Sequence, residues 1–264
     1  MTTSRPTLRR AALALGLGVA TTALAACGED DPSTRAAPPD AEPAADVIDP
    51  GDGGRYDPGV SAADFVDGVT HPFLPLAPGS SWTYEGTADG EAERIEVVVT
   101  PERRKVMGIS AVVVRDTVTA EGQLVEDTFD WYAQDREGNV WYLGEETREY
   151  EGGEVVSTDG SWEAGVDGAL PGIVMPARPR VGSAYRQEYY RGEAEDLAEV
   201  VRLGDRAEVP FGEVDDLVVT KEWNPLEPET VEEKSYARGV GLVLEVKTAG
   251  GEGRVELVEH RPGP

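Results

Sequence analysis

The sequence is poor in the side chains that most often carry catalysis. Its 264 residues include one cysteine, Cys27, and two histidines, His71 and His260. A zinc site needs several His or Cys ligands. The Gly-x-Ser-x-Gly nucleophile elbow, the Walker loop and the dinucleotide fingerprint are also missing. We therefore expect no enzyme activity, no catalytic residue, no cofactor and no metal site.

Basic residues are scarce as well. The chain has 24 Lys and Arg against 51 Asp and Glu, a formal net charge of −27. Nucleic acids and anionic lipid headgroups are bound through cationic contacts, so we expect no nucleic-acid partner. One cysteine cannot form an internal disulfide, and a folded domain in this chain must be stabilised by the burial of apolar surface.

The first 26 residues have the composition of a secretory signal. Residues 1–10 contain three arginines and no acidic residue, and residues 11–26 are an apolar run rich in Ala and Leu. That run is shorter than the roughly 20 apolar residues of a membrane-spanning helix. A basic start, a short apolar stretch and small residues at the end are typical of a signal peptide.

The apolar run ends in Leu24-Ala25-Ala26-Cys27, which resembles the lipobox of bacterial lipoproteins. The resemblance implies cleavage between Ala26 and Cys27, a diacylglyceryl thioether on the Cys27 thiol and acylation of the new amine. More than one acyl chain is needed for stable anchoring. The expected location is the extracytoplasmic face of the cell membrane. The alternative is an ordinary signal peptide with an incidental cysteine.

The segment that follows is predicted to be a tether. Residues 27–57 are acidic, rich in Pro, Ala and Gly, and poor in large apolar side chains. Such a segment cannot bury enough surface to offset its ordering entropy, so we expect it to be disordered. Its flexible span would be on the order of 30 Å. The folded domain is then expected over residues 58–264.

Residues 58–264 read as mainly β. From Trp82 onward, short runs of β-branched and aromatic residues are separated by Gly-containing turns, and no long amphipathic helix is present. We expect about ten to twelve strands in an antiparallel meander. Because a sheet of that length normally curls to protect its edges, the predicted fold is a single strongly curved antiparallel sheet or an incomplete barrel.

The clearest element is a hairpin over 123–151. Its turn begins at Asp135 and has Gly138 at the fourth position, which favours a three-residue loop that pairs Asp135 with Asn139. The register is predicted by alternation, and it separates an apolar face, expected to be core, from an amphipathic face that pairs Tyr132 with Tyr142. The apolar face has Phe129, Trp131, Ala133, Trp141 and Leu143; the amphipathic face has Asp130, Tyr132, Gln134, Val140, Tyr142 and Gly144.

Residues 159–182 are predicted to be a long loop, because prolines and glycines interrupt most of the segment. Loops of about this length are often straps, lids or binding loops. A strap would close one end of the sheet with Leu170, Ile173 and Met175. A lid would cover a ligand. In both cases Trp162 is expected on the loop and outside the core.

Four motifs resemble a family of uncharacterised secreted proteins and lipoproteins of high-GC, actinobacteria-like bacteria. They are Phe73-Leu-Pro-Leu76 with Gly79 and Trp82-Thr-Tyr84; Asp130-Trp-Tyr-Ala-Gln-Asp135 with Gly138-Asn-Val-Trp-Tyr142; Gly160-Ser-Trp-Glu-Ala-Gly165 with Pro171-Gly172; and Tyr236-Ala-Arg-Gly-Val-Gly241. The first and last are also similar to motifs of bacterial envelope half-barrels, which include carriers of lipids or lipoproteins. Neither resemblance implies an activity or a catalytic residue.

The leading functional hypothesis is a membrane-anchored envelope lipoprotein with a non-catalytic binding domain. Asp130, Tyr132, Tyr142 and Trp162 would line a cleft for an apolar or carbohydrate ligand, and an envelope protein is an alternative partner. A second hypothesis is a structural or interaction module without a small-molecule ligand. A third is a glycoside hydrolase with an acid pair drawn from Asp130, Glu145, Glu163 and Asp167.

Overall fold

The computed structural model describes residues 56–264. The predicted signal peptide (1–26), Cys27 and nearly all of the predicted tether lie outside the described residues. Tyr56, the penultimate residue of that tether prediction, is buried: its hydroxyl donates a hydrogen bond to the Pro171 carbonyl at 2.6 Å, and its ring meets Tyr189 edge-on at 5.6 Å. The packed structure therefore includes the end of the segment that composition assigned to the tether.

The described residues form strands and one short 3-10 helix, η1 (Ala62–Asp64), in which Ser61 is the N-cap residue. The strands are β1 (Thr70–His71), β2 (Leu74–Pro75), β3 (Ser81–Ala88), β4 (Glu91–Val106), β5 (Ile109–Ala120), β6 (Gln123–Gln134), β7 (Val140–Glu151), β8 (Glu154–Ser157), β9 (Trp162–Glu163), β10 (Leu170–Met175), β11 (Ala184–Arg186), β12 (Glu188–Tyr189), β13 (Leu197–Val209), β14 (Gly212–Asn224), β15 (Glu227–Ala237), β16 (Gly241–Ala249) and β17 (Gly253–Arg261).

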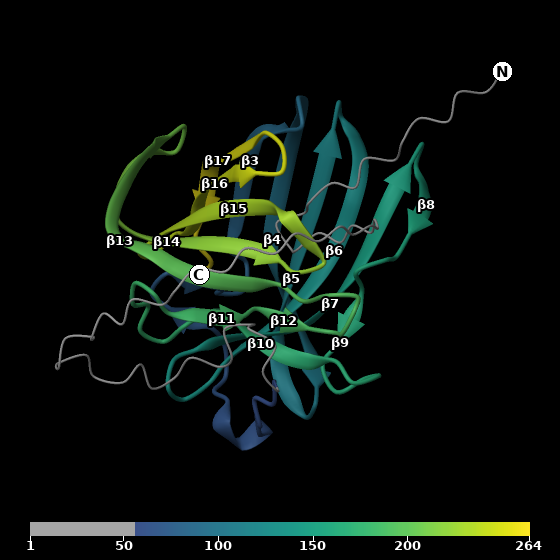
Figure 1. The fold of residues 1–264 in the computed structure, drawn as a ribbon, viewed down its shortest axis with the longest axis vertical. Coiled ribbons are helices and arrows are strands. Elements are labelled where there is room, and N and C mark those ends of the chain that lie inside the picture. Colours follow the sequence, from purple (N-terminus) through teal and green to yellow (C-terminus); the bar gives the residue numbers. More distant parts are fainter. Residues whose placement is uncertain (1–55) are drawn as a thin grey trace, which may run out of the picture.

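Fifteen of these strands belong to one antiparallel sheet, which curves strongly and is not closed into a barrel (Figure 1). The order is β11-β13-β14-β15-β16-β17-β3-β4-β5-β6-β7-β10-β12, with β8 and β9 paired to β7. The prediction of a single curved antiparallel sheet is confirmed. Within residues 56–264, no helix is long and apolar enough to cross a membrane.

The last strand lies in the middle of the sheet. β17 pairs with β16 on one side and with β3 on the other, in a register that places Arg261 opposite Ser81 and Gly253 opposite Ala88. This pairing joins two meanders, β3–β7 and β13–β17, into one sheet. The two ends of the sheet are therefore formed by segments from the middle of the chain.

Those two ends meet at residues 184–189. β11 pairs with β13 at one end of the sheet, β12 pairs with β10 at the other, and the single residue Gln187 lies between β11 and β12. β10, β11 and β12 lie close together below β13 and β14 in Figure 1. Gly172 permits this approach, because a Cβ atom there would lie 2.2 Å from the Gln187 carbonyl group. We call residues 184–189 the seam.

The prediction of a structureless loop over 159–182 is wrong at two places in that segment. Trp162–Glu163 form β9, and Leu170–Met175 form β10, which pairs with β7 and β12. The Pro and Gly content hides β10 because Pro171 lies at the seam end of the strand, and Gly172 is required by the close approach of Gln187. Of the three residues that the strap interpretation placed inside the sheet, Ile173 and Met175 are buried and Leu170 is half-buried.

The predicted hairpin is present in the expected register. Tyr132 pairs with Tyr142 and Ala133 with Trp141, and the Asp135 amide donates to the Asn139 carbonyl at 3.0 Å. A bulge between Asp130 and Tyr132 then shifts the pairing. Both faces are buried here: Trp131 and Trp141 are 3% and 5% exposed, and Tyr142 on the opposite face is 0% exposed.

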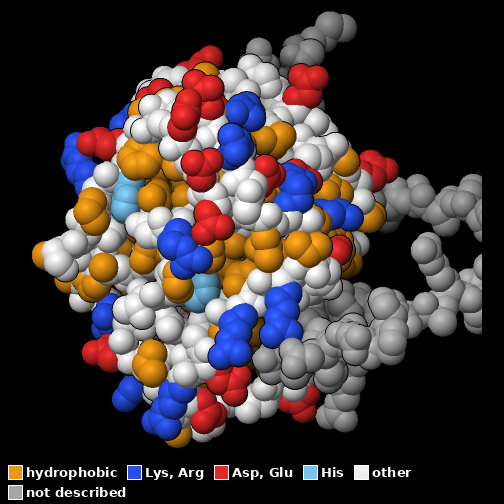
Figure 2. All heavy atoms as spheres, turned by 90° about the vertical axis from the view of Figure 1, so that its left-hand side faces the viewer, with side chains coloured by type: hydrophobic (Ala, Val, Ile, Leu, Met, Phe, Trp, Pro, Cys, Tyr) orange, Lys and Arg blue, Asp and Glu red, His pale blue; other side chains and the backbone are white. Residues whose placement is uncertain are grey.

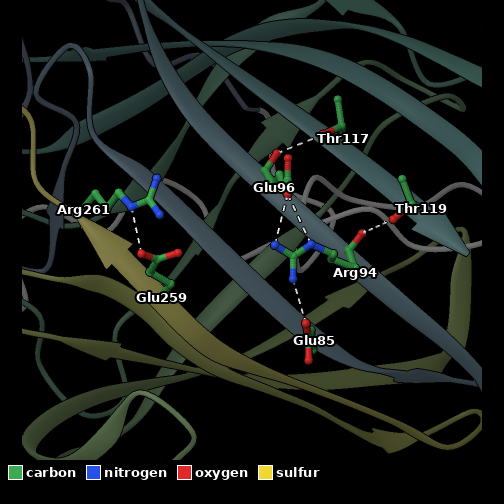
Figure 3. Close-up of polar contacts among 7 residues, drawn as sticks. All are labelled: Glu85, Arg94, Glu96, Thr117, Thr119, Glu259 and Arg261. Carbon is green, nitrogen blue, oxygen red and sulfur yellow. Dashed lines mark hydrogen bonds and ion pairs between the residues drawn. The ribbon is translucent and has the colours of Figure 1, made fainter. Parts of the chain in front are cut away.

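The outer surface carries ion pairs both between neighbouring strands and within single strands. In Figure 3, Arg94 on β4 contacts Glu85 on β3 at 2.7 Å and Glu96 at 3.2 Å, and Arg261 contacts Glu259 at 2.8 Å. Exposed pairs of this kind contribute about 0–1 kcal/mol each. On the face shown in Figure 2, acidic and basic side chains occur together with apolar side chains between them.

Candidate functional site

A cavity of about 100 Å³ lies within the curve of the sheet. Its walls come from both meanders, from the β1–β2 hairpin and from the seam. The lining residues are Leu74, Leu76, Trp82, Tyr84, Val97, Val114, Asp116, Asp130, Tyr132, Val174, Gln187, Glu222, Lys234, Tyr236, Gly241 and Leu242. We call this space the interior cavity.

One part of the interior cavity is apolar. Leu74 of β2 and the nearby Leu76 line it together with Leu242 of β16 and Val174 of β10. The ring of Trp82 is held by a hydrogen bond from its Nε1 to the Val240 carbonyl at 2.7 Å. Aliphatic and aromatic groups are thus available to an apolar ligand.

The rest of the lining is polar and charged. Lys234 of β15 contacts Glu222 of β14 at 3.1 Å and Glu245 at 3.7 Å. Tyr236 also donates a hydrogen bond to Glu222, at 3.3 Å. Asp116 of β5 is 3% exposed. Within residues 56–264 it forms no ion pair, and the neighbouring Arg115 pairs with Asp127 instead.

Acidic side chains dominate the buried charge of the described chain, in which the only buried Lys or Arg side chains are Arg186 and Lys234. The buried acidic residues are Glu93, Asp116, Glu126, Asp127, Asp130, Asp135, Glu145, Glu188, Asp196 and Glu222. Burial of a carboxylate favours its neutral form. The interior of the sheet is therefore an environment in which several carboxyl groups are shifted toward protonation.

The pKa shifts follow from this environment. Burial raises the pKa of Asp116 well above its ordinary value, and the nearby carboxyls of Asp130 and Glu126 raise it further. Burial also raises the pKa of Asp130, against the opposing hydrogen bond from Tyr142. Burial lowers the pKa of Lys234, but the carboxylates of Glu222 and Glu245 outweigh that effect and hold it well above its ordinary value.

Two acceptor atoms at the cavity have neither a hydrogen bond nor an ion pair within residues 56–264. Within residues 56–264, neither Asp116 Oδ1 nor Gln187 Oε1 has a hydrogen-bond partner, although both side chains are only 3% exposed. Buried polar atoms are nearly always hydrogen-bonded, and leaving one unsatisfied costs about 1–3 kcal/mol. Both residues line the interior cavity, so a molecule bound there could satisfy both atoms.

The four residues predicted to bind a ligand form one contiguous group. Asp130 and Tyr132 line the interior cavity. Tyr142 lies behind them: its ring stacks on Tyr132 at 4.9 Å and its hydroxyl donates to Asp130 at 2.6 Å. Trp162 meets Tyr142 edge-on at 5.4 Å. The expectation that Trp162 lies on a loop outside the core is wrong, because it belongs to β9 and is 5% exposed.

The four acidic residues considered for glycoside hydrolysis are not gathered at one place. Asp130 and Glu145 are paired across β6 and β7, and both are buried. Glu163 instead contacts Arg104. Asp167 is exposed in the turn between β9 and β10.

Sequence reasoning missed Asp116, Gln187, Glu222 and Lys234. A signal for Asp116 was present, because it occupies the same strand face as Val112, Val114 and Val118, and all three valines are buried. A charged residue in phase with buried valines indicates a polar group inside the sheet. Gln187 had no comparable signal, because its position depends on the meeting of the two sheet ends.

A second hollow, of about 310 Å³, lies outside this site between the β1–β2 hairpin, the segment after β10 and the β13–β14 strands. Its Arg238 stacks on Phe73 at 4.4 Å and contacts Asp216 at 3.6 Å. We take the interior cavity as the candidate site, because it combines buried, unpartnered acceptors with an apolar wall. Within residues 56–264, no group of three or more His, Cys, Asp or Glu side chains is arranged to hold a metal ion.

Comparison with known proteins gives little further information. No protein-family model and no curated protein matches the sequence. A crystal structure of a candidate lipoprotein from Parabacteroides distasonis aligns with 74% of this chain and 100% of its own length, at 14% identity and a TM-score of 0.34. That degree of similarity is too low to transfer a fold or a function.

Proposed function

We propose that this protein is a lipid-anchored envelope protein whose non-catalytic β domain binds a small amphipathic molecule in the interior cavity. The observation that carries the proposal is the composition of that cavity. An apolar wall that includes Leu74, Leu76 and Leu242 faces the same space as Asp116 Oδ1 and Gln187 Oε1, two buried acceptors without partners among residues 56–264.

Both parts of the cavity favour an amphipathic ligand. Each CH₂ group transferred from water to the apolar wall contributes about 0.8 kcal/mol. A polar head would satisfy acceptors that otherwise stay unpaired in a buried environment. A purely apolar ligand would leave Asp116 Oδ1 and Gln187 Oε1 unsatisfied, and a fully polar one would gain little from Leu74 and Leu76.

The anchoring part of the proposal is supported by the sequence. Leu24-Ala25-Ala26-Cys27 follows a basic start and an apolar run, and Cys27 is the only cysteine of the chain. Two or more acyl chains on this residue would hold the protein on the extracytoplasmic face of the cell membrane. Residues 28–55 would then separate that membrane from the domain.

Native mass spectrometry of the full chain, produced in a host that supplies bacterial lipids and metabolites, tests the binding proposal. We expect a retained small molecule in the wild-type protein and its loss in Leu74→Trp, in which a larger side chain fills part of the cavity. Val155→Trp is the matched control, because Val155 is 49% exposed on β8. Apo protein alone under gentle conditions would count against a ligand and favour an interaction module.

The anchor has a separate test. Cys27→Ala is expected to abolish fatty-acid labelling and to move the protein from the membrane fraction to the soluble extracytoplasmic fraction, because the acylated thiol is lost. Ser33→Ala, a few residues beyond the proposed cleavage site, is the matched control and should leave both readouts unchanged. Fatty-acid labelling that persists in Cys27→Ala would refute the lipobox interpretation.

A further inference from the structure

The polar part of the interior cavity offers acceptors in excess of donors. Asp116 Oδ1 and Gln187 Oε1 can accept hydrogen bonds and have no donor among residues 56–264. The basic group at the cavity, the Lys234 ammonium, is already shared by Glu222 and Glu245. A ligand that fits this arrangement must bring N–H or O–H donors of its own.

The charge around Asp116 has one sign. The neighbouring ionisable groups that act on its carboxyl are Asp130, Glu126, Glu245 and Glu93, all of them acidic. Asp130 is hydrogen-bonded to the neutral hydroxyl of Tyr142. Burial and these acidic neighbours favour the neutral form of Asp116, so a cation bound beside it would hold its carboxyl in the ionised form, and a desolvated charge pair of this kind is strong when well paired.

Aromatic rings complete the surroundings. Trp82, Tyr84, Tyr132 and Tyr236 line the same cavity as Asp116. The faces of such rings attract an ammonium group by about 0.5–2 kcal/mol. Carboxyl groups, an amide oxygen and aromatic rings beside an apolar wall together suit an organic cation.

From this geometry we infer that the ligand of the interior cavity is a small primary amine with an aliphatic body, whose ammonium donates hydrogen bonds to Asp116 Oδ1 and Gln187 Oε1 while its chain packs against Leu74, Leu76 and Leu242. This inference rests on the proposed ligand-binding function and gives it a substrate class. At about 30 Å³ for each water, the cavity of about 100 Å³ holds about three water-sized groups, so it takes the ammonium and the first carbons of a short-chain amine.

Isothermal titration of the full chain carrying Cys27→Ala, which has no lipid of its own to compete, tests the inference with three probes of equal chain length. These are hexylamine, hexanol and hexanoate. We expect hexylamine to bind at least about tenfold more tightly than either of the others, a difference of about 1.4 kcal/mol. Hexanoate is expected to bind worst, because it adds a negative charge beside Asp116.

The outcomes separate the two proposals. If hexanol or hexanoate binds as tightly as hexylamine, the cavity binds a ligand but the amine assignment is wrong. If none of the three binds, both the amine assignment and the proposed function are overturned.

Two variants locate the interaction within the cavity. Asp116→Asn keeps the side-chain shape and removes the charge, and it should reduce the preference for hexylamine over hexanol to less than about threefold. Gln187→Met removes the acceptor and keeps a similar side-chain volume, so it should weaken the binding of hexylamine and leave the binding of hexanol unchanged. This variant provides the test if Asp116→Asn fails to fold. The control is Glu137→Gln, an exposed residue of the β6–β7 turn. An unchanged preference in a folded Asp116→Asn variant would refute the placement.

Discussion

Tyr142 donates a hydrogen bond to Asp130 at 2.6 Å across the β6–β7 hairpin, in the interior of the sheet. Tyr142 is fully buried and Asp130 is 3% exposed, so water is largely excluded from both groups. The hydroxyl and the carboxyl therefore satisfy each other's hydrogen-bonding capacity. The pair lies directly behind the interior cavity, because Asp130 and the stacked ring of Tyr132 line it. The polar wall of the site is therefore part of the packed core.

Tyr142→Phe removes the hydroxyl and leaves the Asp130 carboxyl without its donor. We expect the free energy of unfolding to fall by about 1–3 kcal/mol, the usual cost of an unsatisfied buried polar group. Denaturant titration measures this change. Tyr132→Phe is the matched control, because the Tyr132 ring stacks on Tyr142 but its hydroxyl forms no hydrogen bond within residues 56–264. This variant should change stability by less than about 0.5 kcal/mol.

Trp162→Ala should destabilise the protein by about 3–5 kcal/mol, because a large buried ring that packs on Tyr142 is lost. Val166→Ala is the control in the same segment; Val166 is 49% exposed, and a change of less than about 0.5 kcal/mol is expected. Thermal unfolding of both variants is the measurement. A Trp162→Ala protein with wild-type stability would contradict the core position of Trp162 and favour the lid interpretation of its segment.

Gly172→Ala tests the seam. The added Cβ would lie 2.2 Å from the carbonyl carbon and oxygen of Gln187, so the backbone between β10 and β12 must move. We expect a loss of roughly 1–3 kcal/mol, as for other overpacked sites, together with faster amide hydrogen exchange at Gln187, whose N–H donates to the Asp196 carbonyl. In Gly253→Ala the nearest atom would be Lys247 Cβ at 3.3 Å, so this control should be tolerated. Equal effects of the two substitutions would contradict the close packing of the seam.

Stability should fall as the pH rises, and Glu126 should contribute to this. Burial raises the pKa of Glu126 from 4.5 to about 8 in the folded protein, although a hydrogen bond from Thr128 opposes the shift. A carboxyl with a raised folded-state pKa contributes its full stabilisation below the unfolded pKa and loses it as the pH rises through the folded pKa. The window for Glu126 is therefore pH 4.5 to about 8.

Glu126→Gln keeps the acceptor for Thr128 and cannot ionise. Relative to wild type, the variant should gain roughly 4 kcal/mol of stability between the acidic and alkaline ends of this window, because each unit of the pKa shift corresponds to about 1.4 kcal/mol. Thermal unfolding at both ends gives the comparison. Glu137→Gln, exposed in the neighbouring turn, should follow the wild-type pH dependence. A Glu126→Gln profile parallel to wild type would show that the carboxyl is not held protonated.

Local alternation in the sequence was sufficient to predict the β class, the curved sheet and the register of the β6–β7 hairpin. The turn at Asp135 is stabilised by local hydrogen bonds. The Asp135 carboxylate accepts hydrogen bonds from the Gly138 and Asn139 amides at 2.8 and 2.9 Å and from Trp141 Nε1 at 2.8 Å. These interactions span few residues, so the sequence alone carries the signal.

The candidate site could be predicted only in part. Asp130 and Tyr132 were identified because they flank Trp131 on one strand of the predicted hairpin. Gln187, between β11 and β12, and Lys234, on β15, lie far along the chain, and only tertiary pairing brings them to the cavity. β10 was missed because a Pro-Gly pair such as Pro171-Gly172 is typical of a loop. The glycine is in fact required by the close packing of Gln187 against it, which the sequence does not reveal. Long-range contacts of this kind leave no local pattern.

The position of β17 constrains the order in which the domain can be completed. Because β3 pairs with a strand that ends at Arg261, the first meander has no partner along that edge until almost the whole domain has been synthesised. Sheets dominated by such distant pairings form slowly. β3 is therefore made early and finds this neighbour among the last, so the sheet is completed only when β17 is present.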